Sequence, residues 1–271
     1  ALSVMQLLPK NTTAYGDKSN IIFENQNLVG LGDSVMRTIR GRRIGMIFQE
    51  PMTALNPLHS IERQISEMLS VHGGMKPTQA RARVLELLDL VGLHRLKTRL
   101  NAYPHELSGG QRQRVMIAMA IANKPRLLIA DEPTTALDVT VQAAILDLLA
   151  ALRREEGMGL VLITHSLGVV AEVADEVVVM YAAQVVERGP VTEVFARPLH
   201  PYTRALLAAV PDGEAEPEGI AGVVPRPDSW PPGCRFAPRC DFAQAVCAMP
   251  PPLEEQQGHA VRCARWRELA A

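Results

Sequence analysis

Short apolar runs alternate with segments of helical periodicity along most of the chain. Four runs of apolar and β-branched residues have the length and composition of buried strands, at residues 44–48, 127–130, 160–163 and 177–180. Between these runs, apolar residues recur at the spacing of one helix face, at positions 80, 84, 87, 88 and 91 and at positions 141, 145, 148, 149 and 152. Strands that alternate with helices predict an α/β fold with a mainly parallel sheet.

The composition of the chain changes near Gly189. Thirteen of the 20 prolines lie between Pro190 and Pro252, and all four cysteines also lie after that point. The stretch between the first two predicted strands has no strong strand signal and is predicted to be a helical insertion. These shifts divide the chain into a core segment at 1–49, a helical part at 50–126, a second core segment at 127–189 and a Pro- and Cys-rich extension at 190–271.

The charge balance of the chain limits its partners. Lys and Arg total 28 and Asp and Glu 29, so no bulk positive charge attracts nucleic acid, and we expect no nucleic-acid partner. No apolar run reaches the roughly 18–20 residues of a spanning helix, so the chain is not expected to cross a membrane by itself. A hydrophobic content of 47% is typical of a globular domain.

Two acidic residues, Asp131 and Glu132, follow the apolar run at 127–130. Ligands of an α/β sheet bind outside the carboxyl ends of its strands, which is where these side chains are expected to emerge. An aspartate there can hold Mg²⁺, and an adjacent glutamate can accept a proton from an attacking water. The alternative is a strand that ends in a solvated acidic turn.

A second candidate site is the string Ser108-Gly109-Gly110-Gln111, which precedes a helical stretch at 112–123. Ser108 and Gln111 have the spacing of a capping box, which would explain them without any ligand. Relative to alanine, each glycine destabilises the helix by about 0.8–1 kcal/mol. Two glycines are therefore expected here only if something must approach the backbone closely. Exposed amides at a helix N-terminus suit a phosphate, so we favour phosphate contact over simple capping.

Five elements of the chain, in the expected order, resemble the nucleotide-binding subunit of ATP-binding cassette (ABC) transporters. They are the Q-loop glutamine Gln49, the signature at 107–111, the Walker B strand at 127–132, the D-loop at 136–138 and the switch histidine His165. The chain departs from the family at Ser166, where aspartate is frequent. The strings at 49–57 and 200–203, the latter followed by the cysteines, are similar to the ATPases of di- and oligopeptide importers.

The resemblance implies a P-loop NTPase-like ABC cassette that binds ATP and Mg²⁺ between two cassettes. In such a site Asp131 would hold Mg²⁺, and Glu132 would polarise the attacking water. His165 would contact the γ-phosphate, and Gln49 would contact the metal and the water. Nucleotide contacts would also come from the D-loop and the signature, through Asp138, Ser108, Gly109, Gly110 and Gln111.

The phosphate loop of this family, G-x-x-x-x-G-K-[ST], does not occur in the 271 residues. In the family the loop lies directly before a helix, and residues 1–9 resemble that helix already under way. We therefore expect the chain to be truncated at or before this loop. The alternative is a non-catalytic cassette that supplies only its signature to a partner.

The four cysteines of the extension, Cys234, Cys240, Cys247 and Cys263, are separated by 5, 6 and 15 residues, without a C-x-x-C pair. In a reducing compartment they favour a metal site over disulfides. A Cys₄ set suits zinc or an iron–sulfur cluster, and free thiols are the third alternative. The resemblance to peptide importers favours a [4Fe–4S] cluster. Four arginines lie nearby and would either favour an anionic cluster or solvate the surface: Arg235, Arg239, Arg262 and Arg265.

The resemblance implies an ATPase that energises the import of di- or oligopeptides from the cytoplasmic face of the cell membrane, to which it binds peripherally. Its partners would be a second cassette, membrane permease subunits and, indirectly, an extracytoplasmic peptide-binding protein. Another nutrient such as nickel is an alternative cargo. A soluble cassette ATPase of the DNA-repair or chromosome-structure kind is disfavoured, because residues 50–126 are too short for its long coiled coil.

Overall fold

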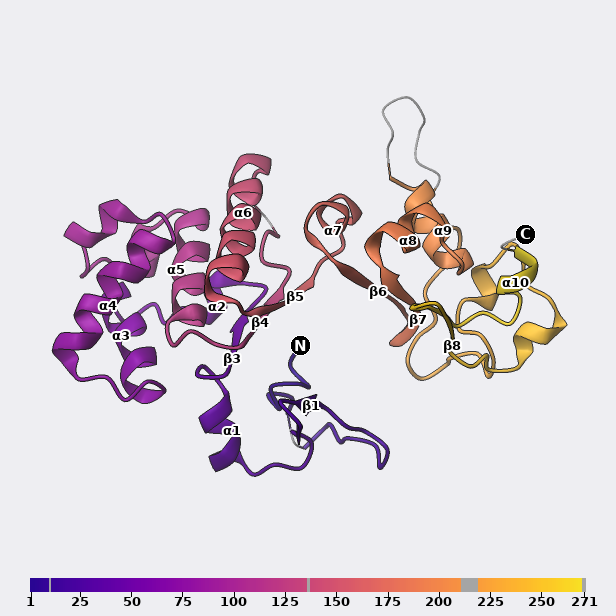
Figure 1. Cartoon of the computed structure of the whole chain (residues 1–271), viewed down its shortest axis with the longest axis horizontal. Coiled ribbons are helices and arrows are strands. Elements are labelled where there is room, and N and C mark those ends of the chain that lie inside the picture. The colour runs from indigo at the N-terminus through magenta and orange to yellow at the C-terminus, as the bar shows by residue number, and fades with distance from the viewer. Residues whose placement is uncertain (10, 136, 211–218, 270–271) are drawn as a thin grey trace. The chain divides into compact units, whose positions relative to one another are not determined.

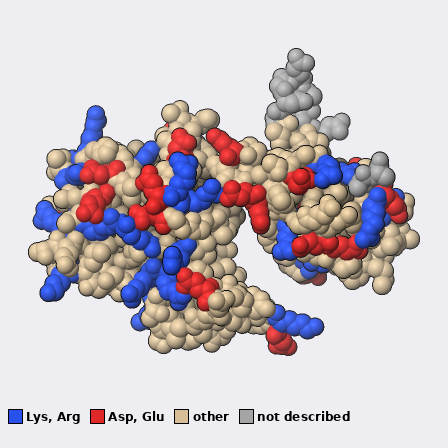
Figure 2. All heavy atoms as spheres, viewed as in Figure 1, with Lys and Arg blue, Asp and Glu red and all other residues tan. Residues whose placement is uncertain are grey.

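The computed structural model describes residues 1–9, 11–135, 137–210 and 219–269. The chain divides into two units, Ala1–His165 and Ser166–Ala271, each of which contains a sheet (Figure 1). None of the helices in the described ranges is long and apolar enough to span a lipid bilayer. On the face seen in Figure 2, Lys and Arg are interspersed with Asp and Glu, in keeping with the formal net charge of −1.

The larger sheet of the first unit is parallel, as predicted. Its strands lie in the order β3 (Ile44–Ile47), β4 (Leu127–Asp131), β5 (Gly159–Ile163). Asp131 pairs with Ile163, so the carboxyl ends of β4 and β5 meet at one edge of the sheet. The prediction that β5 is buried is wrong, since Val161 is 46% exposed. The reason is that β5 is an edge strand, which among the described residues pairs with β4 alone.

The segment between β3 and β4 is helical, as predicted. All of its residues are described, and none of them forms a strand. The apolar face predicted around residues 80–91 is fully buried in the core of this part. The helices are α2 (Pro51–Ala54), α3 (Ile61–Val71), α4 (Pro77–Leu90), α5 (Gly109–Ile121) and two 3-10 helices, η1 (His94–Thr98) and η2 (Pro104–Glu106).

Helix α6 (Val139–Glu156) connects β4 to β5. Its predicted apolar face is confirmed, because Ile145, Leu149 and Leu152 are buried in the same core as α4. The helix ends at Gly157, whose φ of +62° closes the last turn in the left-handed region that glycine adopts without a Cβ penalty.

The first nine residues are not a helix, which corrects the expectation from the sequence. They form a single turn that ends in a Schellman motif at Gln6, which has a φ of +49°. The amide of Gln6 donates to the Ser3 carbonyl at 3.1 Å, and the amide of Leu7 donates to the Leu2 carbonyl at 3.0 Å. The rest of the segment before β3 contains β1 (Ile22–Phe23), β2 (Gln26–Asn27) and α1 (Asp33–Ile39).

The second unit contains an antiparallel sheet, whose strands lie in the order β6 (Glu176–Tyr181), β7 (Gln184–Pro190), β9 (His259–Val261), β8 (Glu254–Gln256). The run at 177–180 was expected to be a buried strand, and this is wrong: Val178 is 54% and Met180 57% exposed. β6 is an edge strand with alternating burial. The boundary near Gly189 stays a prediction, because β7 continues across that residue.

Helices of the second unit precede and follow its sheet strands. The hairpin of β8 and β9 was not predicted. It joins the extension to β7, because Val261 pairs with Glu187 and Ala260 pairs with Arg188. The extension is therefore part of the sheet rather than a separate tail. The helices are α7 (Leu167–Val173), α8 (Val191–Ala196), α9 (Pro201–Ala208), α10 (Trp266–Leu269) and the 3-10 helices η3 (Ala237–Arg239) and η4 (Ala245–Ala248).

Candidate functional site

Glu132 lies directly after β4, at the carboxyl edge of the parallel sheet. Its amide donates to the Ile163 carbonyl at 2.9 Å, which continues the pairing of β4 with β5 beyond the end of the strand. Its φ of +45° places it in the left-handed region, which costs a non-glycine residue about 1 kcal/mol or more. Such strain concentrates at functional sites, because the surrounding contacts must hold the residue in place.

Three side chains converge on the Glu132 carboxylate. Gln49 Nε2 donates to Oε2 at 3.0 Å, and Thr135 Oγ1 donates to the same oxygen at 2.8 Å. On the other side, His165 Nδ1 lies 3.6 Å from Oε1. The structure therefore brings together Gln49, Glu132 and His165, which were singled out as catalytic in the sequence. Thr135 was missed, because a threonine three residues after an acidic strand end carries no distinctive signal.

These contacts keep Glu132 ionised. The hydrogen bond from Thr135 is the main cause that holds the pKa of the Glu132 carboxyl below its ordinary value, and His165 and Gln49 lower the pKa further. Partial burial opposes this shift. An ionised carboxylate can accept a proton from a water molecule, which is the chemistry expected of a general base. The His165 side chain is 76% exposed and remains accessible to a ligand.

Asp131 is the last residue of β4 and lies half-buried beside Glu132. No group of three or more His, Cys, Asp or Glu side chains in the described residues is placed to hold a metal ion. This is compatible with Mg²⁺ at Asp131, because Mg²⁺ is usually bound through one or two carboxylates together with the phosphates of the substrate. The residues present therefore fit a magnesium–nucleotide complex better than a metal site made by protein alone.

The signature residues form the N-terminus of α5. The Ser108 hydroxyl accepts from the Gln111 amide at 3.3 Å, and the Gln111 side chain accepts from the Ser108 amide at 3.0 Å. The capping box is thus formed. A Cβ on Gly109 would have its nearest neighbour at 3.8 Å, whereas a Cβ on Gly110 would lie 2.8 Å from a Val141 methyl. Packing against α6 therefore requires a glycine at position 110, and contact with phosphate stays a prediction for both glycines.

The D-loop aspartate caps the next helix. Asp138 is the N-cap of α6 and accepts from the Val141 amide at 2.9 Å. Ala136, which begins the D-loop string, lies outside the described residues. Ser166, the departure from the family after the switch histidine, is the N-cap of α7, and its hydroxyl accepts from the Val169 amide. An aspartate could fill the same capping position, so the substitution preserves the local structure.

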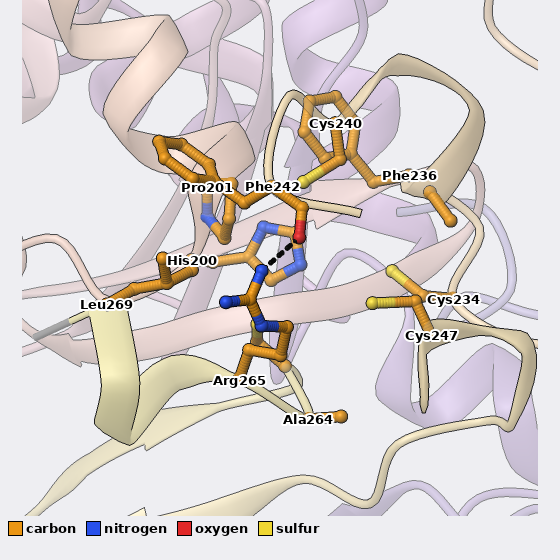
Figure 3. A pocket seen from close by; sticks show the side chains of 12 residues that line it. His200, Pro201, Cys234, Phe236, Cys240, Phe242, Cys247, Ala264, Arg265 and Leu269 are labelled. Carbon is orange, nitrogen blue, oxygen red and sulfur yellow. Dashed lines mark hydrogen bonds between the residues drawn. The ribbon is translucent and has the colours of Figure 1, made fainter. Parts of the chain in front are cut away.

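All four cysteines line one cavity of about 20 Å³ in the second unit, and all are free thiols (Figure 3). In Figure 3 the sulfur atoms of Cys234, Cys240 and Cys247 lie around the same space. Burial raises the pKa of the Cys234, Cys240 and Cys263 thiols. The described residues contain no group placed to hold a metal ion, so neither zinc nor the [4Fe–4S] cluster is supported here. A space of this volume is near the size of a single water molecule.

The four arginines of the extension are half-buried, and Arg265 lines the cysteine cavity. Each donates to backbone carbonyl groups: Arg235 to Ala182, Arg239 to Ile220 and Ala221, Arg262 to Val185 and Pro251, and Arg265 to Phe242. A planar guanidinium with five donors can satisfy carbonyl groups of irregular backbone that no strand or helix pairs. These arginines therefore hold the proline-rich segment together.

A buried carboxylate, also missed in the sequence, anchors this extension. Glu187 in β7 is fully buried and accepts from the amides of Leu199 and His200 at 2.7 and 2.9 Å. His259 Nε2 of β9 lies 2.7 Å from the same carboxylate. His200 caps α9, and burial lowers its pKa to about 4, so its ring is neutral. The string at 200–203 is thus explained by anchoring rather than by catalysis.

Known proteins are similar to this chain over most of its length. Residues 3–135 match the family model described as ABC transporter, and residues 186–247 match the model described as oligopeptide/dipeptide transporter, C-terminal region. A peptide import ATP-binding protein of Brucella ovis is 50% identical over 100% of this chain and 85% of its own length. A peptide ABC transporter ATP-binding protein of Sinorhizobium fredii is 51% identical over 99% of this chain and 82% of its own length.

Solved structures are also similar to this chain. One is the dimeric structure of a post-hydrolysis state of the ATP-binding cassette MJ0796 bound to ADP and Pi, with a TM-score of 0.56 and 32% identity over 62% of this chain and 72% of that one. Another dimeric structure of MJ0796, a bacterial ABC transporter cassette, has a TM-score of 0.57 and covers 64% and 73%. The chain therefore belongs to the ABC transporter ATPases, in the group that carries the oligopeptide/dipeptide transporter C-terminal region.

Proposed function

We propose that this chain hydrolyses ATP to energise the import of di- or oligopeptides. The observation that carries the proposal is the convergence of Gln49, Thr135 and His165 on the ionised Glu132 carboxylate at the carboxyl end of β4. The cargo follows from the C-terminal region of the oligopeptide/dipeptide type and from relatives named for peptide import.

In the proposed reaction, Glu132 accepts a proton from the water that attacks the γ-phosphorus. Gln49 orients that water through its hydrogen bond to the same carboxylate. His165 contacts the γ-phosphate from its exposed position beside Glu132. Asp131 holds Mg²⁺, which neutralises charge on the phosphate oxygens when it is bound.

The signature and D-loop complete the site across a dimer. Ser108, Gly110 and Asp138 contact the nucleotide held by a second cassette, which is consistent with the dimeric state of the MJ0796 structures. The assembled pair acts peripherally at the cytoplasmic face of the membrane, on permease subunits that receive peptides from an extracytoplasmic binding protein.

The cargo of the proposed transporter can be tested directly. Uptake of radiolabelled dipeptides, oligopeptides and nickel by vesicles that contain the assembled transporter tests the cargo. ATP-dependent uptake of peptides and none of nickel is expected, whereas uptake of nickel alone would contradict the proposal.

A further inference from the structure

The backbone of the signature and the first turn of α6 are in direct contact at one pair of residues. A Cβ built on Gly110 would meet three atoms of Val141, with Cγ1 at 2.8 Å, Cγ2 at 3.7 Å and Cβ at 3.9 Å. A Cβ at 2.8 Å from a methyl carbon is accommodated only if the Val141 side chain or one of the two helices shifts. The contact therefore fixes the distance between the N-termini of α5 and α6.

The position of Val141 is restrained by its helix and by its neighbours. Val141 is β-branched and lies in a helix, where one χ1 rotamer strongly dominates. Its amide is held by the Asp138 carboxylate at 2.9 Å, and its side chain packs against the main core of the first unit. Asp138, Val141 and Gly110 thus form a short rigid link from the D-loop to the signature.

At the signature end of this link lie backbone amides that can donate hydrogen bonds to a ligand. In the described part of the chain, the capping box uses the amides of Ser108 and Gln111. It leaves the amides of Gly109 and Gly110 as the open donors of the first helical turn. A displacement of α6 that carries Val141 along would therefore displace the Gly110 amide as well.

We propose that Val141 is a positioning residue, which transmits the position of the D-loop aspartate to the Gly110 amide of the signature. This inference rests on the proposed function, because the Gly110 amide matters only if it contacts a nucleotide. The inference adds Val141, which the motifs of the family do not include. It also gives the glycine at position 110 a packing role, in addition to allowing a phosphate to approach the backbone.

The test is a double-mutant cycle in the assembled transporter with MgATP as the probe, comparing Gly110→Ala, Val141→Ala and the combined variant. With alanine at 141, the nearest atom to a Cβ at 110 is the alanine Cβ at 3.9 Å, an ordinary contact. Gly110→Ala alone should lower kcat by about tenfold, the typical cost of overpacking. In the Val141→Ala background the same change should lower kcat by less than about twofold.

The thermal unfolding midpoint of each purified chain provides the second measurement. Gly110→Ala should lower this midpoint in the wild-type background and should not lower it when residue 141 is alanine. The matched control is Gly109→Ala, which should keep or raise the midpoint, because its Cβ has no neighbour nearer than 3.8 Å. If Gly110→Ala does not fold, recovery of folding in the combined variant supports the contact, and failure of both overturns it.

Two outcomes would overturn the positioning role. One is a combined variant whose unfolding midpoint recovers while kcat stays as low as in Gly110→Ala, since glycine would then be required by phosphate approach alone. The other is a Gly110→Ala variant with wild-type kcat. A wild-type transporter without ATPase activity would instead refute the proposed function, while the unfolding cycle still reports the contact.

Discussion

Gln49 Nε2 and Glu132 Oε2 lie 3.0 Å apart, although the two residues are 83 positions apart in the chain. The two residues follow neighbouring parallel strands, β3 and β4, so the carboxyl ends of these strands bring them together. Gln49 also begins the connection to α2 and the helical part. A single hydrogen bond therefore connects the Glu132 carboxylate to the residue from which the helical part begins.

Thr135→Val should shift the pH dependence of ATP hydrolysis. The hydrogen bond from Thr135 is the main cause of the lowered pKa of Glu132, so its loss raises that pKa. The acid limb of the kcat profile should then move to higher pH, because the base becomes protonated earlier as the pH falls. Thr134→Val is the control at the neighbouring position, and an acid limb that moves equally in both variants would contradict the assignment.

The same lowered pKa has a consequence for stability. Because the pKa of Glu132 is lower in the folded than in the unfolded chain, ionised Glu132 stabilises the fold above its unfolded pKa. This contribution is lost as the pH falls through the folded pKa. In Thr135→Val the folded pKa lies closer to the unfolded pKa, so the contribution is smaller and its loss is complete at a higher pH, which thermal unfolding across the acid range would detect. Identical acid-unfolding curves for wild type and variant would be the contrary result.

Glu187→Ala should destabilise the second unit strongly. It removes the buried acceptor of two amides and the partner of His259, and each buried polar group left without a partner typically costs about 1–3 kcal/mol. Both tryptophans, Trp230 and Trp266, lie in this unit, so denaturant unfolding followed by tryptophan fluorescence reports on it. Glu255→Ala breaks a half-exposed pair with Arg188 and should cost about 0.5 kcal/mol or less. Equal losses would refute the anchoring role.

Gly233→Ala should open the cysteine cavity. A Cβ at this position would lie 2.2 Å from the Cys247 carbonyl oxygen, which accepts from the Cys234 amide at 2.9 Å. Overpacking of this kind costs about 1–3 kcal/mol. The buried thiols should then react faster with a thiol reagent, measured by absorbance. Gly219→Ala, which meets nothing within 4 Å, should leave the reaction rate unchanged.

Much of the first unit could be predicted from the sequence because its signals are local. The apolar periodicity predicts α4 and α6, and the β-branched runs predict β3 and β4. The edge positions of β5 and β6 could not be predicted, since burial depends on which strands pair and not on the run itself. The turn at residues 1–9 was mistaken for a helix, because a left-handed glutamine gives no sign in the sequence.

Site residues that belong to a sequence motif could be predicted. Residues that act only through neighbours in the folded structure could not. Glu132 follows a recognisable strand, but Thr135 and Val141 act only through contacts that the fold creates. Likewise, Glu187 is one glutamate among many until β7, β9 and the segment before α9 surround it. The charge of the arginines beside the cysteines left two interpretations open, and it could not reveal their hydrogen bonds to backbone carbonyl groups, which depend on the fold.

The central claim is that Glu132 of this chain acts as the base in ATP hydrolysis that drives peptide import. The most direct measurement compares wild type with Glu132→Gln in vesicles that contain the assembled transporter, recording phosphate release and uptake of labelled dipeptide together. Loss of the base should lower both rates by about 10²–10⁴-fold while ATP binding persists, and Glu155→Gln should change neither. Full phosphate release and uptake by Glu132→Gln would contradict the account.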